Sequence, residues 1–317
     1  MVYILLLIGF LLLIKGADLF VAGSSNLARL LRVPPILIGL TIVAFGTSAP
    51  EATVSIIAAI EGNADVSLGN VVGSNIFNLT LVVGVAAFIF PLVVQSETIR
   101  KEIPFTLLAS GALLILISDI VLQGFGSNLL TRSDGLIFLL FFSVFMYYVI
   151  EIGLKSRKES LSVEIPKDIT WGRNTFLTLI GLGAIVLGGD MVVDNGTEIA
   201  YTLGMSETLV GLTIIAIGTS LPELVTSITA ALRKESEIAL GNIVGSNIFN
   251  ILFVLGASSI ISPLPINDKV FLDVILMIVL TFILLLFSRT HYTVGKKEGF
   301  ILAFIYIIYM VYIIVRN

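Results

Sequence analysis

The chain has 317 residues, of which 57% are hydrophobic and only 13% are charged, and its mean hydropathy is +1.08. Soluble domains carry about 25% charged residues, so this composition excludes an ordinary soluble domain and predicts a protein that crosses the membrane many times. The net charge of −4 gives no support for nucleic-acid binding, and the absence of cysteine excludes disulfides and thiolate metal sites.

Ten apolar segments are expected to be transmembrane helices, which makes the fold all-α and polytopic. The first segment lacks the basic start and the cleavage site of a signal peptide, so we expect it to stay in the protein. Several segments exceed the ~20 residues that a bilayer requires and should be tilted or broken. The expected spans are residues 2–28, 34–60, 66–91, 103–122, 134–154, 174–202, 207–231, 238–262, 269–288 and 297–315.

Lysine and arginine are distributed unequally between the two sides that these spans define. One set of alternate loops holds 14 of them and the other set holds 3, with Lys15 inside the first span. Because basic loops remain in the cytoplasm, we expect a multi-pass plasma-membrane protein with both termini outside the cytoplasm. A cytoplasmic linker, residues 156–173, then separates two five-span units, residues 1–155 and 174–317.

The two units contain the same motif. Residues 38–78 and 210–250, offset by 172 positions, are identical at 24 of 41 positions. The motif is GTSAPE with GNVVGSNIFN in the first copy and GTSLPE with GNIVGSNIFN in the second, within residues 37–79 and 209–251. Because each unit has an odd number of spans, the second copy enters the membrane from the opposite side. The sequence therefore predicts two inverted repeats, as in many secondary transporters with a midplane binding site.

Each copy places a glutamate, Glu51 or Glu223, in the middle of an apolar span. A charge at the centre of a membrane helix costs on the order of 3 kcal/mol. The one basic residue well inside a span is Lys15, and Asp18 is its expected partner one helical turn away. The two glutamates must therefore be protonated or bind cations from solution.

The residues around the glutamates favour cations. The proline before each glutamate should break spans two and seven, freeing carbonyl groups at the negative end of a helix dipole. We expect breaks at the core of spans three and eight as well. All the available ligands are oxygens, which suit Ca²⁺ and Na⁺. The candidate metal ligands are Ala44, Thr47, Ser48, Glu51, Ser74, Asn78, Ala216, Thr219, Ser220, Glu223, Ser246 and Asn250.

The paired motifs resemble the two signature repeats of the sodium/calcium exchanger family of Ca²⁺:cation antiporters. The short linker is similar to that of prokaryotic members, which lack a large regulatory domain. The resemblance implies electrogenic exchange of about three Na⁺ for one Ca²⁺ by alternating access, driving Ca²⁺ export without a cofactor. It also implies that Glu51, Glu223 and the carbonyls of Thr47 and Thr219 bind Ca²⁺, that the serines complete two Na⁺ clusters, and that Asn78 and Asn250 flank the centre.

Other functions remain open at this point. A proton/calcium exchanger is disfavoured by the Thr–Ser oxygens, and potassium dependence by asparagine at position 250, where some relatives have aspartate. Tight binding by paired acids argues against a passive channel. An intramembrane serine protease needs a membrane histidine, and His291 lies in an expected loop, so we expect no enzyme. The expected partners are the lipid bilayer, Ca²⁺ and Na⁺, with no nucleic acid, and the expected oligomeric state is a monomer.

Overall fold

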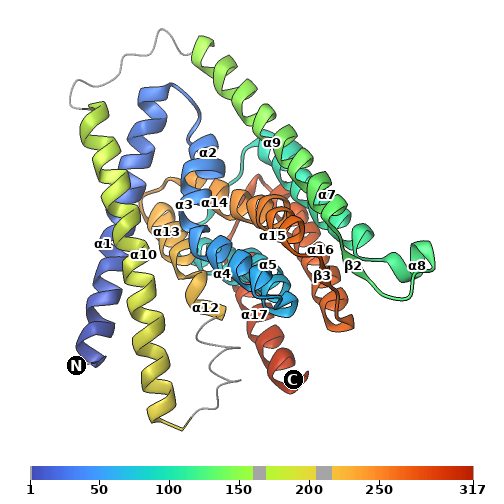
Figure 1. The fold of residues 1–317 in the computed structure, drawn as a ribbon. Helices are drawn as coiled ribbons and strands as arrows, with labels where there is room; N and C mark the ends of the chain where they lie inside the picture. The colour runs from blue at the N-terminus through green and yellow to red at the C-terminus, as the bar shows by residue number, and fades with distance from the viewer. Residues whose placement is uncertain (1, 160–168, 205–215, 317) are drawn as a thin grey trace.

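The computed structural model describes residues 2–159, 169–204 and 216–316, and most of this part of the chain is helical (Figure 1). Seven of its helices are long and apolar enough to cross a membrane, and the bent pair Pro35–Thr47 and Ala49–Ile60, which meet at 50°, is an eighth candidate. The seven are Val2–Leu31, Ala64–Ile89, Arg132–Lys158, Trp171–Thr202, Ser236–Ile261, Lys269–Arg289 and Lys296–Arg316. The expectation of a multi-pass membrane protein built from α-helices is confirmed, and the described residues also form four two-residue strands.

The elements are labelled as in Figure 1, with π-helical segments marked η. The first half contains α1 (Val2–Leu31), α2 (Pro35–Ile38), η1 (Gly39–Val43), α3 (Ala44–Thr47), α4 (Ala49–Ile60), α5 (Ala64–Phe77), η2 (Asn78–Val82), α6 (Val83–Ile89), β1 (Leu92–Val93), η3 (Thr98–Glu102), α7 (Ile103–Leu116), α8 (Asp119–Gln123), β2 (Leu129–Leu130) and α9 (Arg132–Glu159). The second half contains α10 (Trp171–Thr202), α12 (Ala216–Thr219), α13 (Leu221–Leu232), α14 (Ser236–Ile248), η5 (Phe249–Leu255), α15 (Gly256–Ile261), β3 (Leu264–Pro265), α16 (Asp268–Arg289), β4 (Thr293–Val294) and α17 (Lys296–Arg316).

Two of the ten expected spans are not among these eight candidates. The span expected at 103–122 contains α7, which is 14 residues long and is followed by the short helix α8. The span expected at 207–231 begins within residues 205–215, which lie outside the described part of the chain, as do residues 160–168 of the expected linker. The first residues of the second motif copy, 209–215, are outside it too.

The helix is interrupted beside each motif proline. Helix α3 ends at Thr47 and α4 begins at Ala49, with Pro50 in the first turn of the new helix. The second copy repeats this arrangement at Ser220 and Pro222. Proline is tolerated in a first turn because its missing N–H would have no intrahelical partner there. The expected breaks in spans two and seven are confirmed, but the Ala44 carbonyl is not free, since it accepts the Ser48 amide at 2.9 Å.

Spans three and eight correct the sequence expectation. Each is one continuous helix, Ala64–Ile89 or Ser236–Ile261, and not a broken one. Each instead contains a π-helical segment, η2 beginning at Asn78 and η5 containing Asn250. A π-helical turn widens a helix locally and is frequent at functional sites. The backbone irregularity therefore falls at the motif asparagines, without interrupting either helix.

The motif helices form the centre of the protein. In the most apolar window of Ser236–Ile261, 94% of the residues are buried, and 72% are buried in Ala64–Ile89, against 22% to 33% in the other five long helices. Helices α1 and α10 pack against each other along one side of this centre, and α7 and α9 lie on the opposite side (Figure 1). The motif is thus shielded by a more exposed outer set of helices.

Motif glycines allow the two halves to approach closely. A Cβ atom added at Gly241 of α14 would lie 2.8 Å from the Gly39 Cα, and one added at Gly245 would lie 2.7 Å from the Leu40 Cα. Neither distance is possible for a larger residue without a shift of backbone. Small residues spaced four apart are a common device for such close helix packing in membranes. Helix α14 of the second half therefore lies directly against η1 of the first.

Two small antiparallel sheets also join the halves. Strand β1 pairs with β4, with Leu92 opposite Val294, and β2 pairs with β3, with Leu129 opposite Pro265. Each sheet connects two loops that the Lys and Arg distribution assigns to the same side of the membrane. The pairing is thus compatible with the sidedness predicted from the sequence.

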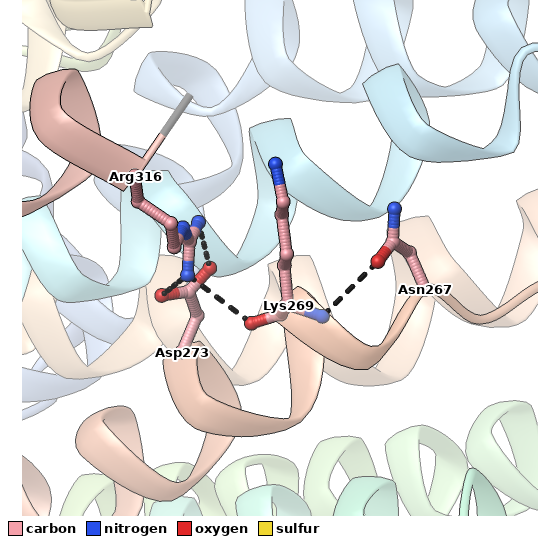
Figure 2. A network of polar contacts seen from close by, with 4 residues as sticks. All are labelled: Asn267, Lys269, Asp273 and Arg316. Carbon is pink, nitrogen blue, oxygen red and sulfur yellow. Dashed lines mark hydrogen bonds and ion pairs between the residues drawn. The ribbon is translucent and has the colours of Figure 1, made fainter.

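Two arginine–aspartate pairs tie helices together. On α17, Arg316 donates two hydrogen bonds to Asp273 of α16 at 3.0 and 2.9 Å, and one to the Lys269 carbonyl at 3.3 Å (Figure 2). Asn267 caps the start of α16 (Figure 2). Arg233, just after α13, lies 2.7 Å from Asp18 of α1. The expectation that Asp18 pairs with Lys15 in its own helix is therefore wrong.

Candidate ion-binding site

Glu51 and Glu223 are both completely buried, and their helices bring them into one site. Each lies in the first turn of its helix, α4 or α13, where the positive end of the helix dipole stabilises a carboxylate. Ser220 donates a hydrogen bond to Glu51 at 2.9 Å, and Ser48 donates one to Glu223 at 2.7 Å. The serine of each motif copy thus contacts the glutamate of the other copy.

The serines of spans three and eight complete this part of the site. The Ser220 hydroxyl lies 2.9 Å from the Ser74 hydroxyl, so it can donate to Glu51 while it accepts from Ser74. The Ser246 hydroxyl donates to the Ala44 carbonyl at 3.5 Å. Both contacts join the two motif copies, and all four residues were predicted as ligands from their repeated positions.

Two further asparagines, Asn70 and Asn242, donate hydrogen bonds to the backbone carbonyls of the two glutamates, and we call them the bracing asparagines. They were not predicted as site residues. Asn242 donates to the Glu223 carbonyl and to Ser227, and accepts from Thr47 at 2.9 Å. Asn70 repeats the pattern with the Glu51 carbonyl, with Ser55, and with Thr219 at 3.4 Å. The signal that could have found them was present, because both are polar residues repeated at the same offset within apolar spans.

The predicted asparagines Asn78 and Asn250 are also fully buried. The Asn78 amide donates to the Asn247 side-chain oxygen at 3.1 Å, and the Asn250 amide donates to the Asn75 side-chain oxygen at 3.2 Å. Asn75 also donates to the Asn247 backbone carbonyl at 3.3 Å. These contacts form a buried amide cluster, one turn beyond Ser74 and Ser246, that again connects the two copies.

Four buried oxygens of this region have no hydrogen-bond partner among the described residues: one each from Glu51, Glu223, Asn78 and Asn250. A buried polar atom without a partner costs about 1–3 kcal/mol, and an unpaired buried carboxylate costs more. A cation would satisfy such oxygens. The described residues contain no group of three or more acidic, histidine or cysteine side chains suited to a metal. The other oxygens that contact the two carboxylates are neutral hydroxyls.

Most of the twelve predicted ligands therefore meet at the centre of the protein. Hydrogen bonds connect Thr47, Ser48, Glu51, Ser74, Thr219, Ser220, Glu223 and Ser246 with the Ala44 carbonyl and the bracing amides, and Asn78 and Asn250 lie in the adjacent amide cluster. Ala216 begins α12, three residues before Thr219. The arrangement can neutralise and desolvate small hard cations.

Comparison with known proteins identifies the family. The model of the sodium/calcium exchanger protein family matches residues 1–151 and 173–315. The chain belongs to the sodium/calcium exchanger family. Members of this family are membrane transporters and not enzymes.

Two relatives and one solved structure show the extent of the similarity. The chain is 36% identical to the inner membrane protein YrbG of Escherichia coli, covering 96% of this chain and 94% of that protein. It is 32% identical to the sodium/calcium exchanger MaX1 of Methanosarcina acetivorans, with coverage of 98% and 97%. A structure of the sodium–calcium exchanger NCX_Mj, soaked with Na⁺ and Sr²⁺, matches with a TM-score of 0.84 and 31% identity, covering 98% of this chain and 99% of that one.

Proposed function

We propose that this exchanger is an electrogenic Na⁺/Ca²⁺ antiporter that moves about three Na⁺ inward for each Ca²⁺ exported. The observation that carries the proposal is the pair Glu51 and Glu223, buried together, with one oxygen on each carboxylate that has no hydrogen-bond partner among the described residues. The hydrogen-bond donors to both carboxylates are neutral hydroxyl groups, which do not cancel the charge. Cations from solution would do so.

Charge counting explains why such a site would exchange the two ions. With both glutamates ionised the site carries two negative charges, which one Ca²⁺ or two Na⁺ neutralise. A third Na⁺ would leave one positive charge, and exchange at that ratio would move net charge across the membrane. Because Ca²⁺ and Na⁺ both need the same carboxylates, full occupancy by one excludes the other. Shared ligands and alternating access then suffice for antiport.

The proposed roles follow the donor types. Glu51, Glu223 and the carbonyls of Thr47 and Thr219 would bind Ca²⁺, with Asn78 and Asn250 flanking the centre. One Na⁺ cluster would use Ala44, Thr47, Ser48, Glu51 and Ser74, and the other would use Ala216, Thr219, Ser220, Glu223 and Ser246. Carboxylate, carbonyl and hydroxyl oxygens are the ligands that hard cations prefer. The contacts of the Ser220 hydroxyl with Glu51 and Ser74 join ligands of the two clusters and support the closeness of the clusters to each other.

We infer further that the transporter consists of two inverted five-span repeats, residues 1–155 and 174–317, with ten spans in total. The contacts across the site support this inference because they occur in equivalent pairs. Ser48–Glu223 corresponds to Ser220–Glu51 at an offset of 172 residues, and the contacts of Asn242 correspond to those of Asn70. Such pseudo-two-fold symmetry would allow one half to rock against the other around a fixed site.

The proposed setting is the plasma membrane, with both termini outside the cytoplasm, residues 156–173 as a cytoplasmic linker, and a monomer as the functional unit. The excess of lysine and arginine on one side supports this orientation. The two sheets, which join loops assigned to the same side, are consistent with it. With an inward sodium gradient, the physiological direction would be Ca²⁺ export.

Radiocalcium flux into liposomes tests the proposal. Purified protein is reconstituted, and ⁴⁵Ca uptake is measured under an imposed gradient of Na⁺, K⁺ or H⁺, one at a time. We expect uptake driven by an outward Na⁺ gradient alone. Three Na⁺ leaving for each Ca²⁺ that enters moves one net positive charge out of the liposome, so an inside-positive membrane potential should accelerate uptake and an inside-negative one should slow it. Uptake driven by a pH gradient in sodium-free buffer would establish a proton/calcium exchanger instead. A requirement for K⁺ together with Na⁺ would establish a potassium-dependent exchanger.

A further inference from the structure

Two buried asparagines, Asn75 and Asn247, lie beside the proposed ion ligands and are not among them. Both are completely buried, and each directly follows a predicted serine ligand in the sequence. The side-chain oxygen of Asn75 accepts the Asn250 amide at 3.2 Å, and that of Asn247 accepts the Asn78 amide at 3.1 Å. We call Asn75 and Asn247 the anchors. Each anchor therefore accepts a hydrogen bond from the central asparagine, Asn250 or Asn78, of the other motif copy.

This contact decides which end of each central amide is available. A side-chain amide carries an oxygen acceptor and an NH₂ donor on the same carbon, so fixing the NH₂ group fixes the direction of the oxygen. In Asn78 and Asn250 the NH₂ groups are bonded to the anchors, while both side-chain oxygens are buried without a hydrogen-bond partner among the described residues. A flipped amide would present N–H hydrogens, which repel a cation.

We propose that Asn75 and Asn247 are positioning residues, which hold the amides of Asn250 and Asn78 so that their oxygens face the transported cation. This inference rests on the proposed function, because it takes Asn78 and Asn250 as groups beside the ion. It adds a pair of residues that act through those ligands, each from the opposite half of the chain. Ion affinity in one half then depends on a side chain of the other.

The two anchors are held differently. The Asn75 NH₂ group donates to the Asn247 backbone carbonyl at 3.3 Å and lies 3.6 Å from the Met277 sulfur. The Asn247 NH₂ group has no hydrogen-bond partner within the described part of the chain. Replacing the Asn247 amide by a carboxyl group therefore removes no hydrogen bond and keeps the acceptor for Asn78. Leucine is similar in size to asparagine, so replacing Asn247 by leucine removes that acceptor at nearly constant volume.

A double-mutant cycle on the full-length protein in liposomes tests the inference. Sodium-driven ⁴⁵Ca uptake is measured over a range of Ca²⁺ concentrations for Asn78→Leu, Asn247→Leu and the double variant. We expect Asn247→Leu to raise the apparent KM for Ca²⁺ about tenfold, equivalent to ~1.4 kcal/mol, with little change in the maximal rate per folded protein. We expect the double variant to be no worse than Asn78→Leu alone, because Asn247 acts through Asn78.

Two controls separate positioning from a general structural role. Because Asn247→Asp retains the acceptor, its KM for Ca²⁺ should rise no more than about threefold above the wild-type value. Ser258→Ala removes another buried hydroxyl without a described partner and should leave the KM unchanged. If Asn247→Leu does not fold, Asn247→Ala serves in the same cycle. Additive effects of the two substitutions, or a defect in Asn247→Asp as large as in Asn247→Leu, would overturn the inference.

The cycle also distinguishes this inference from the proposed function. If Asn78→Leu impairs uptake and Asn247→Leu does not, the positioning role is wrong and the proposed exchange function stands. If the wild type shows no sodium-driven uptake, or Asn78→Leu leaves it unchanged, the assignment of Asn78 to the ion site fails and the positioning role fails with it.

Discussion

Within the motif copies, the two halves of the chain make equivalent side-chain contacts. In the helices around the motifs, they do not. At the site, Ser48 and Ser220 reach each other's glutamates, and Asn70 and Asn242 make matching contacts. In the outer helices the agreement disappears. Asp273, which pairs with Arg316, aligns with Lys101 at the same offset, and Lys101 lies over the Tyr148 ring instead.

The Asp18–Arg233 pair shows the same loss of symmetry. Asp18 aligns with Asp190, but the residue that aligns with Arg233 is Glu61. An equivalent contact in the other half would place two acids together, so this ion pair belongs to one side of the molecule. The comparison teaches that the halves agree where side chains of the two motif copies meet in the candidate site, and differ where a helix only needs to pack.

The largest expected effect comes from substituting the two glutamates of the symmetric site. Glu51→Gln and Glu223→Gln should each abolish Ca²⁺ transport, because each removes one of two charges that balance the ion. A unit-charge interaction at ~4 Å is worth about 4 kcal/mol at an effective dielectric constant of ~20, so uptake should fall by more than ~100-fold. Sodium-driven ⁴⁵Ca uptake measures this, with exposed Glu61→Gln as the control. Normal uptake by either site variant would refute the assignment.

The next effect tests the ion pair that joins the last two helices, α16 and α17. Among the described residues, the first half has no equivalent pair. The side chains of Asp273 and Arg316 are 12% and 17% exposed, and their contact is bidentate. Removing one partner of a buried pair costs about 3 kcal/mol or more, so Asp273→Asn should lower the unfolding temperature in detergent by several degrees. The apparent KM for Ca²⁺ should not change. The exposed Lys297→Gln of the same helix α17 is the matched control, and an equal shift in it would contradict the interpretation.

A smaller effect concerns the two motif serines. Ser220 contacts both Glu51 and Ser74, whereas the contact of Ser48 is with Glu223. A hydrogen bond to a charged group is worth ~1.5–3 kcal/mol, so Ser220→Ala should weaken the apparent Na⁺ affinity about tenfold, and more than Ser48→Ala. Sodium titration of Ca²⁺ exchange measures both. Equal losses would mean that the two copies are functionally equivalent here.

The smallest effect tests whether the halves are geometrically related. The Asp18–Arg233 side chains are 46% and 40% exposed, so this pair should contribute only ~0.2–1 kcal/mol. Glu61→Arg would create the equivalent pair with Asp190 if the repeats are inverted copies. A double-mutant cycle of Glu61→Arg with Asp190→Asn, read by thermal unfolding, should show a coupling of the same small size. No coupling would argue against equivalent geometry at these positions.

Much of the site could be predicted because the motif is duplicated. Repeated acids, prolines and hydroxyls in apolar spans identify Glu51, Glu223 and their neighbours without any coordinates. The bracing residues Asn70 and Asn242 were missed, although each follows a motif glycine at the same repeated position. In the second copy, the glycines of GNIVG pack closely against the first half, and its asparagine donates hydrogen bonds to the Glu223 carbonyl and to Ser227. The expected breaks in spans three and eight were wrong because residues 64–89 and 236–261 contain no proline to interrupt them, and their π-helical segments leave each helix continuous.

The sequence by itself determined a duplicated membrane protein with two uncompensated acids in apolar spans, since hydropathy and repeated residues are local properties of the chain. Only the tertiary structure decided which groups meet: the serine of one copy with the glutamate of the other, Asp18 with an arginine 215 residues away, and each central amide with an anchor in the opposite half. The physical reason is that hydrogen bonds between distant segments depend on how the helices pack, and helical periodicity specifies a face but not its partner.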